Sequence, residues 1–148
     1  MNIYFICTGN TCRSPLAEAL VNHANVPGIT AKSAGIHAID GLPISANSAQ
    51  LLTEEKIPFT PYSNEVKSAD MEWADIVLTM TANHRDFLHS RFPAMKEKVF
   101  TLKEYAGTMT GLDVHDPYGG DLETYRTTFH ELTQLINSVI RQQAEGNL

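Results

Sequence analysis

The chain has 148 residues, of which 43% are hydrophobic and 19% are charged, and its formal net charge is −6. This length and composition predict one folded domain with a substantial core over residues 1–148. The negative charge argues against nucleic acid as a partner. No apolar run approaches the ~20 residues needed to span a membrane, so we expect no membrane association.

The first predicted elements are a strand, a loop and a helix. Residues 3–6 form a short apolar run suited to a buried strand. Ser14 is a good helix N-cap and Pro15 fits the first helical turn, where no amide hydrogen is needed. The backbone amides of the intervening loop should therefore converge at a helix N-terminus, which is a favourable site for phosphate.

The rest of the chain alternates between strand and helix patterns. The expected strands cover residues 3–6, 29–36, 74–80 and 99–102, and the main expected helices cover 15–24, 45–56, 81–91 and 122–140. A short helix capped by Ser68 or Asp70 is expected to run through Trp73. This order predicts an α/β fold with a doubly wound, four-stranded parallel sheet flanked by helices. Such sheets bind ligands beyond the carboxyl ends of their strands.

A cysteine and an arginine stand at the two ends of the first loop. Thiolate is the reactive form of cysteine, and helix N-termini and cationic neighbours lower the thiol pKa. The planar guanidinium of Arg13 can bind two phosphate oxygens at once. A cysteine after a buried strand is often only a small core residue, but the loop and Arg13 favour Cys7 as a nucleophile that attacks phosphorus.

Two separated motifs carry a resemblance to a known family. Cys7 to Ser14 match the pattern Cys-x5-Arg-Ser at a first strand-to-helix turn, and the Asp-Pro pair expected far downstream is Asp116-Pro117. By these motifs, which extend over nearly the whole chain, the sequence resembles the low-molecular-weight protein tyrosine phosphatase family, in its bacterial protein-arginine-phosphatase branch. The resemblance implies a single phosphatase domain over residues 1–148 that uses a phosphocysteine intermediate and no cofactor.

The resemblance also implies roles for individual residues. Cys7 is the expected nucleophile, and Arg13 should stabilise the phosphoryl oxygens. The expected phosphate-binding residues are Thr8, Gly9, Asn10, Thr11, Cys12, Arg13 and Ser14. From the residues alone, Asp113 rivals Asp116 as the general acid, and the resemblance favours Asp116, which would then act as base toward water.

Further residues are expected to support or protect the nucleophile. Asn10, Ser14 and Ser33 match positions that hold the loop in the family. Cys12 either packs under the loop or traps oxidised Cys7 as a disulfide. A histidine that buttresses the loop in several relatives has no evident counterpart here, since Pro61 lies near its expected place. The six histidines lack metal-ligand spacing, so no metal site is predicted.

Thr11, Tyr118 and His37 are the predicted specificity residues, with residues 37–42 facing Tyr118 across the entrance. Threonine at position 11 resembles the arginine-directed branch, because a small hydroxyl can pair with guanidinium N–H groups that a larger aliphatic side chain would leave unpaired. Protein phosphoarginine is therefore the favoured substrate, and phosphotyrosine is the alternative.

Two other functions are disfavoured by the residues present. Thiol-coupled arsenate reduction would need a further pair of cysteines, and the chain has none after Cys12. A non-catalytic phospho-residue binding module would be expected to lose Cys7 or the acid. We expect a monomeric enzyme that acts on phosphorylated proteins in the cytoplasm, where a reactive thiolate finds a reducing environment.

Overall fold

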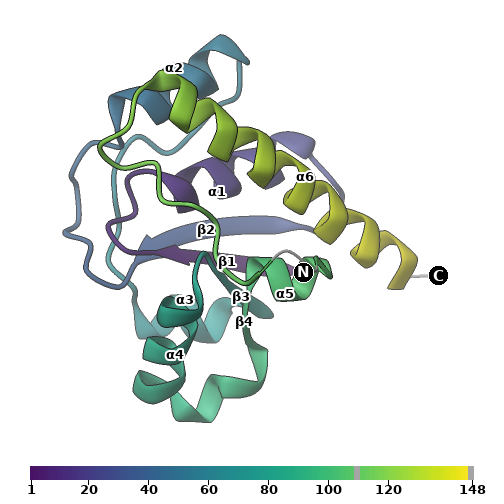
Figure 1. Cartoon of the computed structure of the whole chain (residues 1–148). Helices are drawn as coiled ribbons and strands as arrows, with labels where there is room; N and C mark the ends of the chain where they lie inside the picture. Colours follow the sequence, from purple (N-terminus) through teal and green to yellow (C-terminus); the bar gives the residue numbers. More distant parts are fainter. Residues whose placement is uncertain (109–110, 147–148) are drawn as a thin grey trace.

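The computed structural model describes residues 1–108 and 111–146, and its centre is a four-stranded parallel sheet (Figure 1). The strands are β1 (Asn2–Cys7), β2 (Thr30–Gly35), β3 (Ile76–Thr79) and β4 (Val99–Thr101). Their order across the sheet is β2-β1-β3-β4. The first strand therefore lies inside the sheet, paired with β2 on one side and β3 on the other, as the predicted doubly wound fold requires.

Helices cover both faces of this sheet. They are α1 (Arg13–Ala24), α2 (Ala46–Glu54), α3 (Ser68–Trp73), α4 (Ala82–Arg91), the 3-10 helix η1 (Pro93–Lys98), α5 (Leu102–Ala106) and α6 (Leu122–Gly146). Figure 1 shows α1, α2 and α6 on one face, with α3 and α4 on the other. No helix within the described ranges is long and apolar enough to cross a membrane.

The alternation of side chains along β1 explains the two layers. Successive strand residues point to opposite faces of a sheet. Ile3 and Phe5 accordingly join the core under α1 and α6, whereas Tyr4 and Ile6 join a second core that includes Met71 of α3. All four β1 residues are almost completely buried. A continuous apolar strand is thus explained by helices on both faces.

Three local predictions are wrong. The first helix begins at Arg13 rather than after a Ser14 cap, and no side chain caps it. Neither Ser68 nor Asp70 caps α3, whose N-cap is Lys67. Leu102 starts the unpredicted helix α5 instead of ending β4, because Thr101 and Glu104 form a capping box there.

Candidate active site

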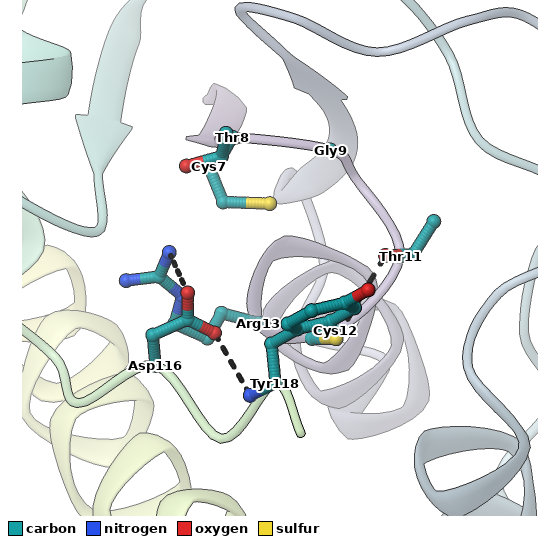
Figure 2. Close-up of a pocket in the computed structure, with 8 residues that line it drawn as sticks. All are labelled: Cys7, Thr8, Gly9, Thr11, Cys12, Arg13, Asp116 and Tyr118. Atoms are coloured by element: carbon teal, nitrogen blue, oxygen red, sulfur yellow. Dashed lines mark hydrogen bonds and ion pairs between the residues drawn. The ribbon is translucent and has the colours of Figure 1, made fainter.

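The loop after β1 forms one wall of a pocket at the carboxyl end of the sheet. The pocket has a volume of about 240 Å³ and is lined by Cys7, Thr8, Gly9, Thr11, Cys12, Arg13, Asp116 and Tyr118. Figure 2 shows the sulfur of Cys7 pointing into the space between this loop and Asp116. The folded chain therefore brings the two predicted motifs together.

The shape of the loop depends on two backbone positions. Asn10 has a φ of 56°, in the left-handed region that asparagine adopts more readily than most residues. Gly35, at the end of β2, lies directly under the loop. A Cβ atom there would be 2.4 Å from the carbonyl oxygen of Thr8 and 2.8 Å from the amide nitrogen of Asn10. Only glycine allows β2 to approach the loop this closely.

Hydrogen bonds behind the loop point toward the Cys7 thiol. The side-chain amide of Asn10 donates to Ser14 Oγ at 2.8 Å and to Ser33 Oγ at 3.0 Å. Ser14 Oγ lies 2.8 Å from Cys7 Sγ and donates to the carbonyl oxygen of Ala34 at 3.4 Å. Ser14 Oγ accepts from Asn10 and has a single hydrogen, for which the Ala34 carbonyl oxygen and the Cys7 sulfur compete. These contacts place a buried hydroxyl directly beside the sulfur.

Glu18 extends these bonds and was missed by the sequence analysis. Its carboxylate accepts from Ser33 Oγ at 3.0 Å, and its side chain is buried. Burial raises the pKa of Glu18, while hydrogen bonds from Thr60 and Ser33 oppose this shift. The only sequence signal is an acidic residue inside the otherwise apolar run of residues 16–21.

A backbone amide supports the loop near the place where several relatives have a buttressing histidine and this chain has none. The N–H of Asn64 donates to Asn10 Oδ1 at 2.7 Å, three residues beyond Pro61. Together with the two bonds donated by its side-chain amide, this contact fixes the orientation of Asn10. Asn10, Ser14 and Ser33 therefore lie behind the pocket rather than in its lining.

Arg13 is held in place by the segment that carries the candidate acid. Its Nη1 donates to the carbonyl oxygen of Val114 at 3.0 Å, and its Nη2 lies 3.7 Å from Asp116 Oδ2. The Arg13 side chain is only 5% exposed, whereas that of Asp116 is 54% exposed. Asp116 Oδ1 accepts from the backbone N–H of Tyr118 at 3.0 Å (Figure 2). The carboxylate thus lies at the mouth, with the guanidinium beneath it.

The rival carboxylate has a different position. Asp113 Oδ1 accepts from the backbone N–H of Ala82 at 2.8 Å, at the N-terminus of α4. Asp113 lines a neighbouring cavity and not the pocket that contains Cys7. Asp113 therefore connects the segment that carries the candidate acid, Asp116, to the N-terminus of α4.

The predicted specificity residues lie in two places. Thr11 and Tyr118 line the pocket, and Tyr118 is 80% exposed. His37 instead lines the neighbouring cavity, where its ring packs edge-on against Phe87 at 5.7 Å between centroids.

Both cysteines are buried free thiols. Cys12 Sγ lies 3.3 Å from the hydroxyl of Tyr125 in α6. Burial, followed by the hydrogen bond with Cys12, raises the pKa of Tyr125 to about 12. The neutral phenol can therefore donate to the Cys12 sulfur, an interaction that sequence reasoning missed.

In the part of the chain with described coordinates, no cluster of three or more His, Cys, Asp or Glu side chains could hold a metal ion.

Comparison with known proteins decides the family. The family model of low molecular weight phosphotyrosine protein phosphatases matches residues 2–146. The chain belongs to this family. It is a cysteine-dependent phosphatase, and the fold and the pocket described above agree with that membership.

Individual relatives are similar over most of their length. A protein-arginine-phosphatase of Geobacillus stearothermophilus is 43% identical over 91% of this chain and 90% of its own. The low molecular weight protein-tyrosine-phosphatase PtpB of Staphylococcus haemolyticus is 37% identical over 94% of this chain and 97% of its own.

A solved structure supports the assignment of the chain to this phosphatase family. It is a YwlE arginine phosphatase C7S mutant with a phosphorylated active-site serine, and it is 39% identical to this chain. The TM-score is 0.90, and the alignment covers 96% of this chain and 95% of that chain.

Proposed function

We propose that this phosphatase hydrolyses phosphoarginine side chains of proteins. The observation that carries the proposal is Thr11 on the lining of the pocket that contains Cys7. A threonine hydroxyl can accept a hydrogen bond from a guanidinium N–H, whereas an aliphatic side chain would leave that donor unpaired. The 43% identical relative that is named a protein-arginine-phosphatase supports the same reading.

In the proposed first step, the Cys7 thiolate attacks phosphorus in line with the P–N bond of phosphoarginine. The S–P bond forms as the P–N bond breaks, and protonated Asp116 donates its proton to the departing guanidine nitrogen. Arg13 and the loop amides stabilise the charge on the equatorial oxygens. The products are a phosphocysteine enzyme and free arginine on the substrate protein.

In the proposed second step, the Asp116 carboxylate removes a proton from water, which attacks phosphorus. The S–P bond breaks, inorganic phosphate leaves, and Cys7 returns to the thiolate supported by Ser14. The half-exposed position of Asp116 at the mouth supports both roles, because the leaving nitrogen and the incoming water approach from the same side.

Binding of the phosphoryl group also engages Arg13. A dianionic phosphoryl group competes with the Asp116 carboxylate for the guanidinium. The bond from Nη1 to the Val114 carbonyl keeps the guanidinium plane in place during this exchange. Asp116 is then free to take up the proton that it donates in the first step.

The test is kcat/KM for a phosphoarginine and a phosphotyrosine peptide, measured for the native protein, Thr11→Ile and Thr11→Ser. Native preference for phosphoarginine is expected, with a shift toward phosphotyrosine in Thr11→Ile. Thr11→Ser keeps the hydroxyl and should keep the native preference. Native preference for phosphotyrosine, or no shift in Thr11→Ile, would overturn the proposal in favour of a tyrosine phosphatase.

We also propose that the protein acts as a monomer in the cytoplasm on phosphorylated proteins. The buried free thiols support this location, because a thiolate enzyme needs a reducing environment. Sedimentation of the purified protein and fractionation of cells that contain it would test these two points separately.

A further inference from the structure

A polar pair beside the nucleophile has no role in the steps proposed above. Thr8 directly follows Cys7 and lines the same pocket. Its Oγ1 lies 2.8 Å from Nε2 of His84, a residue of α4 that is 76 positions away in the sequence. His84 is only 5% exposed, whereas Thr8 is exposed. A buried imidazole thus contacts a hydroxyl at the pocket wall.

The surroundings of the imidazole determine which nitrogen carries its hydrogen. Nδ1 of His84 is buried and has no hydrogen-bond partner among residues 1–108 and 111–146. A hydrogen on Nδ1 would leave a buried N–H donor unpaired, which proteins avoid more strictly than an unpaired acceptor. The tautomer with hydrogen on Nε2 leaves only a lone pair unpaired. In that tautomer, His84 donates to Thr8 Oγ1.

The imidazole is also kept neutral. Burial lowers the pKa of His84 to about 4, and the positive charge of Arg13 acts in the same direction. The carboxylates of Asp113 and Asp116 oppose this shift, and His37 adds slightly to it. Near neutral pH, the imidazole therefore has one hydrogen, and the bond to Thr8 uses it.

We propose that His84 is a positioning residue that fixes the Thr8 hydroxyl so that its hydrogen is donated to an oxygen of the transferring phosphoryl group. Since Oγ1 accepts from His84, its own hydrogen is free for another acceptor. Among the residues with described coordinates, only His84 contacts the Thr8 side chain by a hydrogen bond. The inference rests on the proposed phosphoryl transfer, to which it adds a side-chain donor beside the loop amides.

The experiment compares Thr8→Val, His84→Leu, His84→Gln and the Thr8→Val/His84→Leu double variant. The readouts are kcat and KM for p-nitrophenyl phosphate and the inhibition constant of orthovanadate. Valine has the shape of threonine without its hydroxyl. Glutamine can place an amide N–H near the position of Nε2, and leucine cannot donate.

We expect Thr8→Val to lower kcat and weaken vanadate inhibition by about 10-fold each, which is the usual effect of losing one hydrogen bond to a charged group. KM should change little. His84→Leu should approach the same loss, and the double variant should be no worse than Thr8→Val, because both substitutions remove one shared interaction. His84→Gln should retain most of the native kcat at every pH between 5 and 8.

His89 provides a matched control on the same helix. Its Nε2 lies 3.0 Å from the carbonyl oxygen of Val99, on the side of α4 away from the pocket. His89→Leu should lower thermal stability and leave kcat and vanadate inhibition at native values. The comparison of His89→Leu with His84→Leu separates the general effect of losing a histidine contact in α4 from the specific loss of the hydrogen bond to Thr8.

Three results would overturn the proposal: native kcat and vanadate inhibition in Thr8→Val, additive losses in the double variant, or equal losses in folded His84→Gln and His84→Leu. These readouts do not depend on the identity of the natural substrate. Failure to hydrolyse phosphoarginine would therefore contradict the proposed substrate without affecting the test of His84.

Discussion

The guanidinium of Arg13 lies 3.7 Å from the carboxylate of Asp116, so the candidate phosphate ligand lies directly beneath the candidate acid at the pocket mouth. More than half of the Asp116 side chain is exposed. An ion pair in such a position adds little to folding stability. The pairing is therefore expected to affect catalysis more than folding.

Asp116→Asn should lower kcat for substrates with poor leaving groups by about 100-fold or more, because these need a proton in the transition state. Asp113→Asn is the matched control, since its amide oxygen can still accept from the Ala82 N–H. Both variants should melt near the native temperature. A larger kcat loss in Asp113→Asn would identify Asp113 as the acid.

Cys7→Ser should abolish turnover, because serine at this position is not ionised near neutral pH. The loop bonds made by Asn10 do not involve the sulfur, so orthovanadate should still bind. Calorimetric titration with vanadate and a turnover assay measure the two effects separately. More than trace turnover by Cys7→Ser would contradict the covalent mechanism.

Peroxide should inactivate the native enzyme reversibly by joining Cys7 to Cys12. Cys12 already faces the same pocket as Cys7 and is held by the Tyr125 hydroxyl at 3.3 Å. Cys12→Ser should be inactivated in a form that thiols restore poorly. Mass spectrometry after partial oxidation should detect the intramolecular disulfide, and its absence would remove the proposed protection.

Folding stability should depend on pH through His84. The unfolded chain takes up the imidazole proton near pH 6.5, whereas the folded protein does so only near pH 4. The unfolded state therefore binds more protons between these values, and stability decreases as pH falls from about 6.5 to 4. The full loss is about 3 kcal/mol, at about 1.4 kcal/mol per pKa unit.

Urea unfolding of the native protein and His84→Gln at pH 7 and pH 4.5 would measure this loss. Glutamine does not titrate, so the difference between the two proteins isolates the imidazole from the carboxylates. Equal pH dependence in both proteins would show that folding does not lower the pKa of His84.

Gly35→Ala should displace the loop, because the added Cβ would lie 2.4 Å from the Thr8 carbonyl oxygen. That atom belongs to the backbone and cannot rotate away. Turnover and vanadate binding should both fall by about 10-fold or more, since misplacement of a reacting group by 1 Å can cost about 100-fold in rate. Gly28→Ala adds a Cβ with no neighbour within 4 Å but strains a backbone with a φ of 82°, so it should lower stability and leave kinetics at native values. Native kinetics in Gly35→Ala would show that the loop tolerates the shift.

Much of the fold could be predicted because its signals are local. The apolar run at residues 3–6, the break before Pro58 and the apolar face of α6 each depend on neighbouring residues. Ser14 illustrates where local rules fail. Its hydroxyl would suit a helix cap, but it hydrogen-bonds with Asn10 and lies beside Cys7, and the helix begins at Arg13, two residues before the predicted start at Pro15, without a side-chain cap.

The unpredicted parts of the site depend on contacts between distant segments. The partner of His84 is 76 residues away, and that of Tyr125 is 113 residues away. No spacing rule connects such pairs, because the sheet order and the helix packing bring them together. Cys7 and Arg13 could be recognised because they flank one short loop.

The hydrogen-bonded side chains of Asn10, Ser14, Ser33 and Glu18 lie behind the pocket, whereas Thr11 and Tyr118 line it. Asn10, Thr11 and Ser14 come from one short stretch of chain, but Thr11 lines the pocket whereas the other two lie behind it. Under the proposed role of Thr11, we expect substitutions at the entrance to redirect the enzyme to another phosphorylated side chain while its nucleophile remains intact. The proposal therefore predicts that a single substitution at the entrance is enough to change the preferred substrate.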